Sequence, residues 1–329
     1  MLTKRQNLLE TIRGGQPDRF VNQYEALAIS FGVAPLSFSR TPRKPGDTWT
    51  NAWGITQNWA IGTPGPMPVH DGEHIVMHDI TKWCEQVNAP VLKFTDEQWQ
   101  PLQDFAAGVD RYEQFCAMAM LPGLLEQLHH MMGMEGAMMA MALEPEAVAE
   151  FMQFQVDWEI AYASQIIEHI HPDALFHHDD WGSAKSTLVS PAMFAEIMLP
   201  AYKRLYGFYK SNGIELIVHH SDSYAATLVP LMIEMGIDIW QGVMSTNDIP
   251  ALISQYGGQI SFMGGIDDAK VDVEGWTQEL IAVEVERACR ANGSLYYIPG
   301  ILQGMPTSTF PGVYAAVSRE IDRMSTVLF

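Results

Sequence analysis

Histidines and carboxylates gather directly after two segments that are typical of buried strands. The first run reads HHDDW over residues 177–181, and the second reads HHSD over residues 219–222. An imidazole beside a carboxylate can exchange protons as a general acid and base, or the two can bind a metal ion through nitrogen and oxygen. The residues alone leave both chemistries open. Two such runs in a chain with 11 histidines favour a functional site over simple helix capping.

The spacing within each run pairs one histidine with one carboxylate. We predict that His178 with Asp180, and His220 with Asp222, are catalytic. Side chains alternate across a strand, so His178 and Asp180 share one face while His177 and Asp179 share the other. The sequence does not say which face points to the centre of the fold. If the site holds a metal, His220 and Asp222 are the ligands that this pattern suggests.

Other polar and aromatic residues near predicted strand ends are candidates for binding a substrate. Flat aromatic rings line pockets for aromatic ligands, and carboxylates orient them. The predicted substrate-binding residues are Tyr24, Glu25, Trp53, Asp179, Trp181, Trp240 and Asp267. Trp181 is the best supported of the aromatic residues because it lies within the first polar run.

Short β-prone segments alternate with helical segments along the whole chain, which is typical of a parallel α/β sheet. Strands are predicted at 20–25, 75–78, 112–118, 173–178, 215–220, 237–241, 259–263 and 294–298, and helices at 191–211, 224–235, 249–256 and 277–291. This pattern predicts a (β/α)8 (TIM) barrel. In such a barrel the active site lies at the carboxyl ends of the strands, so the polar runs are expected to converge there.

Composition narrows the class of protein further. The 329 residues carry a formal net charge of −20, which disfavours binding to nucleic acid or to an anionic membrane surface. Three cysteines without CxxC spacing predict neither disulfides nor a thiolate zinc cluster. Neither a signal peptide nor a membrane-spanning run is evident, and no linker divides the chain. We therefore expect one cytoplasmic domain over residues 1–329.

Residues 179–223 resemble members of the uroporphyrinogen decarboxylase superfamily, with an acidic-Gly turn, a Ser-Pro before a helix and a Pro within it. The segments RQNLLETIRGGQPDRFVNQYE, DTWTNAWGIT, MGGID and YYIPG follow in the order expected for that superfamily. The resemblance covers nearly the whole chain. It implies the same (β/α)8 barrel that the alternation of elements predicts.

Two branches of the superfamily fit these residues poorly. The decarboxylases carry an arginine-rich amino-terminal signature that binds a polyanionic substrate, whereas this chain reads RFVNQYEALAIS there and places Glu25 in it. The thiol methyltransferases bind zinc through a motif resembling His-x-Cys and a further cysteine near the last strand. Here the corresponding residues are His220 and Asp222, and PGILQG contains no cysteine. A methylcobalamin:thiol methyltransferase and a divergent decarboxylase remain the alternatives.

The remaining branch implies an O-demethylating methyltransferase. Such enzymes move a methyl group from a small methylated compound to cob(I)alamin on a partner corrinoid protein, and we expect a methoxylated aromatic as the substrate here. The resemblance also implies zinc as an optional cofactor, with a second candidate ligand set at Glu135, Glu150 and His171, which match an E-x14-E-x20-H spacing. These three residues fall on predicted helices. A homodimer is compatible with the sequence, which does not fix the oligomeric state.

Overall fold

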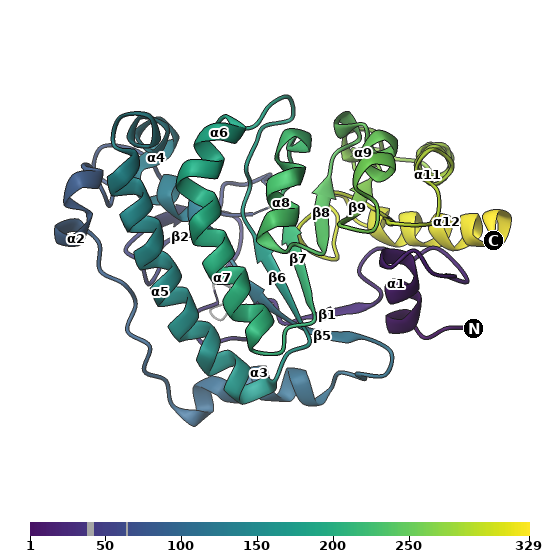
Figure 1. Ribbon diagram of the computed structural model, residues 1–329, viewed down its shortest axis with the longest axis horizontal. Helices are drawn as coiled ribbons and strands as arrows, with labels where there is room; N and C mark the ends of the chain where they lie inside the picture. The colour runs from purple at the N-terminus through teal and green to yellow at the C-terminus, as the bar shows by residue number, and fades with distance from the viewer. Residues whose placement is uncertain (38–42, 64) are drawn as a thin grey trace.

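The computed structural model describes residues 1–37, 43–63 and 65–329, and it is built around one curled sheet of parallel strands (Figure 1). The order of the strands is β1-β5-β6-β7-β8-β9-β10. Their bounds are Leu27–Ile29 (β1), Phe115–Met120 (β5), Ala174–His178 (β6), Leu216–His220 (β7), Ile239–Val243 (β8), Ser261–Gly265 (β9) and Tyr297–Gly300 (β10). The sheet order follows the chain order, and helices cover the outer face. The predicted TIM-barrel type of fold is confirmed, as a curled sheet of seven strands.

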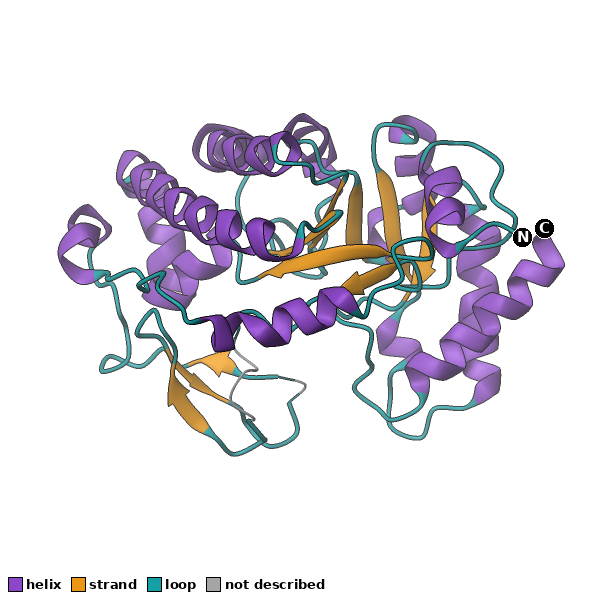
Figure 2. Cartoon of the chain, turned by 90° about the horizontal axis from the view of Figure 1, so that it is seen from below, coloured by secondary structure: helices purple, strands orange, loops and turns teal. Residues whose placement is uncertain are grey.

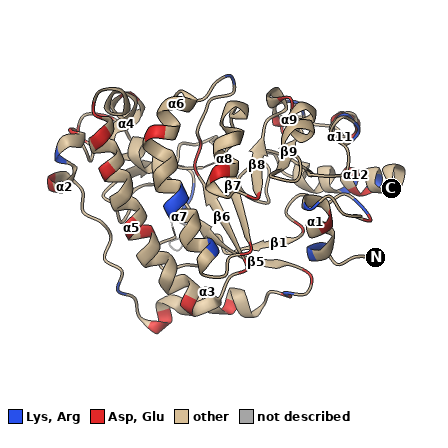
Figure 3. Ribbon diagram, viewed as in Figure 1, with Lys and Arg blue, Asp and Glu red and all other residues tan. Residues whose placement is uncertain are grey.

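Most of the larger helices lie between strands along the chain, while α1 precedes β1 and α12 follows β10, and they pack on the outside of the sheet (Figure 1). Their bounds are Lys4–Ile12 (α1), Asp96–Ala107 (α3), Leu124–Leu143 (α4), Pro145–Ile170 (α5), Leu199–Ser211 (α7), Val229–Met235 (α8), Ile249–Tyr256 (α9), Gln278–Asn292 (α11) and Val313–Leu328 (α12). Short helices are Trp83–Gln86 (α2), Pro191–Met193 (α6) and Asp268–Val271 (α10). A π-helical turn at Phe194–Met198 joins α6 to α7, so the predicted helix 191–211 is continuous in space but changes its hydrogen bonding near Pro200. Acidic side chains are spread over several of the outer helices (Figure 3).

Alternation along the strands separates an inner layer from an outer one. Phe176, Val218 and Ile239 belong to the apolar cluster inside the curl of the sheet. Leu175 and Ile217, one position earlier on their strands, belong to the larger cluster between sheet and helices. Because side chains two residues apart share a face, this parity sends the even-numbered histidines of β6 and β7 inward.

The two edges of the curled sheet, β1 and β10, are linked by one residue. The Gln23 N–H donates to the Pro299 carbonyl at 3.3 Å, and the Ile301 N–H donates to Gln23 Oε1 at 3.4 Å. Gln23 has a φ of 51°, and the Glu25 and Leu27 N–H groups make turn hydrogen bonds around it. The predicted strand 20–25 is therefore wrong, because this segment turns to close the seam and β1 begins only at Leu27.

The predicted strand 75–78 is also wrong. α4 is broken at Gly133, whose φ of 74° is not helical, and the freed Met131 carbonyl accepts the Val76 and Met77 N–H groups at 3.0 and 3.1 Å. The segment is thus held against a helix and not in a sheet. A small antiparallel sheet that the sequence analysis did not predict precedes it, formed by Thr48–Thr50 (β2), Thr56–Asn58 (β3) and Met67–Pro68 (β4) (Figure 2).

Among the described helices, none is long and apolar enough to span a bilayer.

Candidate functional site

Two histidines face each other at the inner, carboxyl end of the sheet. His178 ends β6 and His220 ends β7, and the two residues are paired in the parallel register. Their rings stack with centroids 4.2 Å apart and an angle of 26° between planes. The His220 side chain is 1% exposed and that of His178 is 23% exposed, so the pair reaches from the buried centre of the barrel to its open end.

Gln241 on β8 fixes the proton position of His220. The Gln241 amide nitrogen donates to the carbonyls of Leu302 and Gln303 at 3.4 and 3.3 Å, which orients its Oε1 toward His220. His220 Nδ1 must then donate to that oxygen, because an amide oxygen only accepts. Burial, with repulsion from His178, lowers the pKa of His220 to about 4. The ring is therefore neutral near pH 7, and its Nε2 carries a free lone pair.

Glu126 at the start of α4 holds His178 in the same way. His178 Nδ1 lies 2.8 Å from Glu126 Oε2, and both side chains are largely buried. Burial alone lowers the pKa of His178, but the charge and hydrogen bond of Glu126, aided by Asp180 and Asp222, raise it to about 10. Burial raises the pKa of the Glu126 carboxyl, against the attraction of His178. The His178 imidazole is thus a cation in the metal-free protein. A metal ion that binds the ring would displace its second proton.

Asp179 positions this glutamate from behind the strands. Its carboxylate accepts the backbone N–H groups of Leu125 at 3.0 Å and of Glu126 at 2.7 Å, at the amino terminus of α4. It also accepts the Trp181 indole N–H at 2.9 Å and the Tyr202 hydroxyl. A carboxylate at a helix amino terminus is favoured by the unpaired N–H groups there. Asp179 is fully buried, so it orients the site without touching what binds there.

Three further carboxylates lie around the histidine pair. Asp180 Oδ1 is 3.8 Å from His220 Nε2 and accepts the Asp222 N–H at 2.9 Å. Partial enclosure, together with repulsion from Asp180, raises the pKa of Asp222 to about 8, although part of its side chain reaches solvent. Burial raises the pKa of Asp268, which accepts the Leu302 N–H at 3.0 Å, to about 7. The open end of the barrel therefore holds carboxyl groups that can carry protons near neutral pH.

The donor atoms of His178, Asp180 and His220 fit a divalent metal ion. One ligand atom from each residue lies within 4.8 Å of the other two. Each Nδ1 is already held by an oxygen, of Glu126 or Gln241, which is the outer arrangement that orients metal-binding histidines. Two nitrogens and one oxygen are suitable for zinc, with open positions for a ligand. Metal binding would release the second ring proton of His178.

The structure brings together His178, Asp180, His220 and Asp222, as the strand-end pattern predicted. It also shows which face is inner, which the sequence left open. It associates His220 with Asp180 and His178 as a ligand group, whereas the predicted metal pair joined His220 to Asp222. Asp222 instead contacts Asp180 through its backbone N–H. Their catalytic roles stay predictions.

The three tryptophans that were predicted to bind a substrate pack against other residues of the fold. Trp181 and Trp240 are fully buried on the outer side of the strands. Trp181 stacks on His219 with centroids 3.8 Å apart, and the Trp240 indole N–H donates to the Ser221 carbonyl. Trp53 packs edge-on against Trp158 of α5 at 4.8 Å. Trp181, Trp240 and Asp179 are therefore enclosed, whereas Trp53 is half-buried, and the predicted substrate contacts of these residues stay predictions.

The second candidate metal set cannot share one ion. Glu150 lies within α5 and His171 is the residue that caps its carboxyl end. At a rise of 1.5 Å per residue, 21 residues of helix separate the two by roughly 30 Å. Glu135 is exposed on a different helix, α4. The spacing E-x14-E-x20-H therefore does not define a metal site, because Glu150 and His171 lie at distant points of one helix and Glu135 lies on another.

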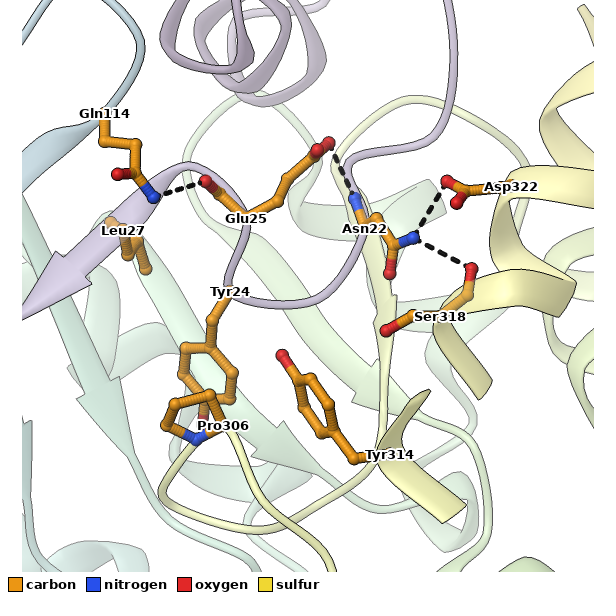
Figure 4. Close-up of a pocket in the computed structure, with 9 residues that line it drawn as sticks. All are labelled: Asn22, Tyr24, Glu25, Leu27, Gln114, Pro306, Tyr314, Ser318 and Asp322. Atoms are coloured by element: carbon orange, nitrogen blue, oxygen red, sulfur yellow. Dashed lines mark hydrogen bonds between the residues drawn. The ribbon is translucent and has the colours of Figure 1, made fainter. Parts of the chain in front are cut away.

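Tyr24 and Glu25 line a cavity of about 400 Å³ at the seam between β1 and α12 (Figure 4). The Tyr24 hydroxyl donates to the Gln303 carbonyl at 2.6 Å, next to the residues that hold Gln241. Glu25 Oε1 accepts the Asn22 N–H at 3.0 Å. Tyr24 thus lies between this cavity and the loop that orients Gln241, whereas Glu25 lies on the cavity side. Their predicted substrate contacts remain predictions.

Three residues that hold or surround the histidines were not predicted from the sequence: Glu126, Gln241 and Asp268. Glu126 follows β5 and Gln241 sits on the inner face of β8, so both were within reach of the strand-end rule. In the GGIDD turn the two aspartates have different partners, and the predicted substrate contact of Asp267 stays a prediction. Asp267 caps α10 by accepting the Ala269 N–H and lies 3.3 Å from Lys270, whereas Asp268 points toward the site.

With the fold and site established, comparison with known proteins gives the class. The family model described as uroporphyrinogen decarboxylase (URO-D) matches residues 123–324, and the chain belongs to that family. This stretch contains β6 to β10 and most of the residues that form the site. A search of curated proteins finds no match.

Among solved structures, a methyltransferase from Methanosarcina mazei is similar, with a TM-score of 0.66 and 13% sequence identity. The match covers 98% of this chain and 99% of that chain, so the two share their fold. A B12-independent methionine synthase from Shewanella sp. W3-18-1, in complex with selenomethionine, gives a TM-score of 0.45 and 13% identity over 80% of this chain and 73% of that chain. That second likeness is too weak to bear on fold or function.

Proposed function

We propose that this protein is a methyltransferase that moves a methyl group from a small methylated substrate, a methoxylated aromatic, to cob(I)alamin carried by a partner corrinoid protein. The observation that carries the proposal is the anchored His178–Asp180–His220 group at the open end of the barrel. A zinc ion held by these residues would act as a Lewis acid on the ether oxygen. The fold shared with the methyltransferase from Methanosarcina mazei is compatible with this reaction.

The protein's own task is to activate the leaving group, since cob(I)alamin is already a strong nucleophile. In the reaction the bond between the methyl carbon and the ether oxygen breaks, a bond between that carbon and cobalt forms, and the phenolate takes up a proton. A free phenol has a pKa near 10. Asp222 lies beside the site, where partial desolvation and repulsion from Asp180 raise its pKa in the metal-free protein, and its carboxyl group could deliver the proton to the phenolate.

The same residues weigh against the two alternatives. A polyanionic substrate for decarboxylation needs several cationic side chains to balance its charge, whereas the described side chains around the histidine pair are mainly carboxyl groups, those of Asp180, Asp222 and Asp268. A thiol methyltransferase needs soft thiolate ligands on its zinc, and the corresponding position holds Asp222. Both alternatives become outcomes of the test below.

The test mixes the purified protein with a corrinoid protein in the cob(I)alamin state and a panel of methoxylated phenols. Formation of methylcobalamin is followed by its absorbance. We expect turnover with at least one methoxylated aromatic, and strong losses in His220→Ala and Asp222→Ala. The matched control is His169→Ala, because His169 stacks on Trp99 at 4.3 Å, on α5 and away from the site.

Absence of methylation with methoxyaromatics, methylamines and betaines would overturn the transferase reading. Methyl transfer from methylcobalamin to a thiol, or carbon dioxide release from a porphyrinogen, would favour one of the alternatives instead.

A further inference from the structure

A second group of metal-binding side chains lies next to the site, on the first two turns of α4. Glu126, His129 and His130 have the spacing i, i+3 and i+4, which places their side chains on one side of a helix. One ligand atom from each residue lies within 4.8 Å of the other two. A Glu-x-x-His pair of this spacing is the unit that binds metal ions in helical carboxylate proteins. The geometry therefore offers two nitrogens and one oxygen.

The two imidazoles have unused capacity to bind. The Nδ1 atoms of His129 and His130 are both buried and have no hydrogen-bond partner among the described residues. A buried polar atom without a partner costs free energy, and native structures satisfy nearly all of them. Their rings meet edge to face with centroids 4.7 Å apart. A bound cation would satisfy the lone pairs that the protein leaves free.

The surroundings enclose this group. Where α4 breaks at Gly133, the Met131 carbonyl accepts the Val76 and Met77 N–H groups, so the segment before α2 crosses the helix beside the histidines. His70 Nε2 lies 3.3 Å from the His130 carbonyl, to which it donates. A residue with a side chain at position 133 would have to adopt the left-handed φ of 74°, and its Cβ would lie 3.6 Å from Ile75. The segment over residues 70–77 thus packs on α4 next to the two histidines.

We propose that Glu126, His129 and His130 bind a second divalent transition-metal ion, adjacent to the one proposed at His178, Asp180 and His220. Imidazole and carboxylate ligands suit zinc and cobalt(II) better than magnesium or calcium, which prefer oxygen alone. Glu126 joins the two sites, because its Oε2 lies 2.8 Å from His178 Nδ1 and its carboxylate also belongs to the second group of ligands. The second site does not depend on the proposed methyl transfer, since it needs only these three side chains.

The experiment counts bound metal in the full-length protein. The chain is stripped with a chelator, dialysed against zinc, and analysed for zinc by elemental analysis. We expect two equivalents in the unaltered protein and one in the double variant His129→Ala/His130→Ala. The double variant His178→Ala/His220→Ala should also retain one, and His169→Ala should retain two. Circular dichroism and thermal unfolding establish that each variant is folded, and His130→Gln serves if the double variant of α4 does not fold.

The number of zinc ions bound by each variant decides whether the second site exists. Two equivalents in both the unaltered protein and the folded α4 variant would overturn the second site. A single equivalent that disappears only with His178→Ala/His220→Ala would overturn it as well. A single equivalent that disappears only with the α4 variant would support this site and count against the metal proposed at His178. Loss of all zinc in both double variants would overturn the two-site arrangement in favour of one shared ion.

Discussion

His178 and His220 occupy the same register position on neighbouring parallel strands, and their rings stack with centroids 4.2 Å apart. Adjacent strands lie about 4.8 Å apart, so a stacked pair is the natural result of two inward histidines at one level of a barrel. Each ring is nevertheless held by a different neighbour, Glu126 for His178 and Gln241 for His220. The pair is therefore fixed in rotation as well as in position, which preorganises both rings for binding.

Replacing Gln241 by Leu tests this fixation. The variant leaves the buried Nδ1–H of His220 without an acceptor, so the ring loses its orientation and its tautomer is no longer set. Loss of such an outer partner lowers metal affinity by about 10- to 100-fold. Zinc affinity, measured by competition with a coloured chelator, should fall by that factor. Gln241→Glu keeps an acceptor for His220 and should retain more affinity than the Leu variant; equal affinity of Gln241→Leu and unaltered protein would contradict the role of Gln241.

Replacing Gly304 by Ala tests the space above the histidines. A Cβ at Gly304 would lie 3.0 Å from His178 Cδ2 and 3.2 Å from His220 Nε2, closer than ordinary contacts. The methyl group would displace the rings or cover the nitrogens that face the open end. Because small displacements of reacting groups are costly, we expect methyl transfer to fall about tenfold or more.

The control for Gly304 is Gly72→Ala, since a Cβ there meets nothing within 4 Å. The rate and the thermal midpoint are measured for both variants. A Gly304→Ala protein with normal transfer would show that substrate and metal do not use the space beside the two rings.

Much of the fold was predictable, because strands that alternate with helices leave a strong pattern in the sequence. Helix 249–256 coincides with α9, and the strands from β6 onward were each found within a few residues. The seam was not predictable. Residues 20–25 have the apolar and aromatic composition of a strand, but Gln23 adopts a left-handed φ and its side chain bonds to the last strand. Only the closure of the barrel, a tertiary constraint, selects that conformation.

The site was predicted in part for a similar reason. Periodicity paired His178 with Asp180, yet it could not say which face of β6 was inner, since His177 and Asp179 have the same spacing and composition. The outer residues are equally polar because they hold helices in place. Asp179 binds the amino terminus of α4, and His219 Nδ1 accepts the Tyr206 hydroxyl at 2.6 Å, since its Nε2 donates to the Asp179 carbonyl. Glu126 lies 52 residues before His178, and only the fold joins them.

Replacing Asp179 by Asn tests the support behind the strands. The carboxylate accepts hydrogen bonds from two backbone N–H groups, from Trp181 and from Tyr202. An amide has one acceptor oxygen, and its NH2 group would face buried donors. Leaving buried donors unpaired costs about 1–3 kcal/mol each, so the free energy of unfolding should fall by about 3 kcal/mol. Urea denaturation measures this change.

Displacement of α4 in Asp179→Asn should also weaken the contact of Glu126 with His178. The comparison variant is Asp267→Asn, which alters the cap of the short helix α10 and the ion pair of Asp267 with Lys270. If both variants unfold at the same urea concentration as the unaltered protein, Asp179 does not anchor α4.

Replacing Asp268 by Asn tests the carboxyl groups at the open end through the pH dependence of stability. Burial raises the pKa of Asp268 to about 7 in the folded protein, against about 3.9 for an unperturbed aspartate. The folded state therefore binds a proton that the unfolded state has released, and the stability that this gives is complete below about pH 4 and lost as pH rises toward 7.

Asn has no proton to lose, and its oxygen can still accept the Leu302 N–H. Relative to the unaltered protein, Asp268→Asn should gain thermal stability as pH rises from 4 to 7, with a constant difference above pH 8. A difference that stays constant from pH 4 to 8, or one that shrinks as pH rises, would show that Asp268 ionises as readily in the folded chain as in the unfolded one.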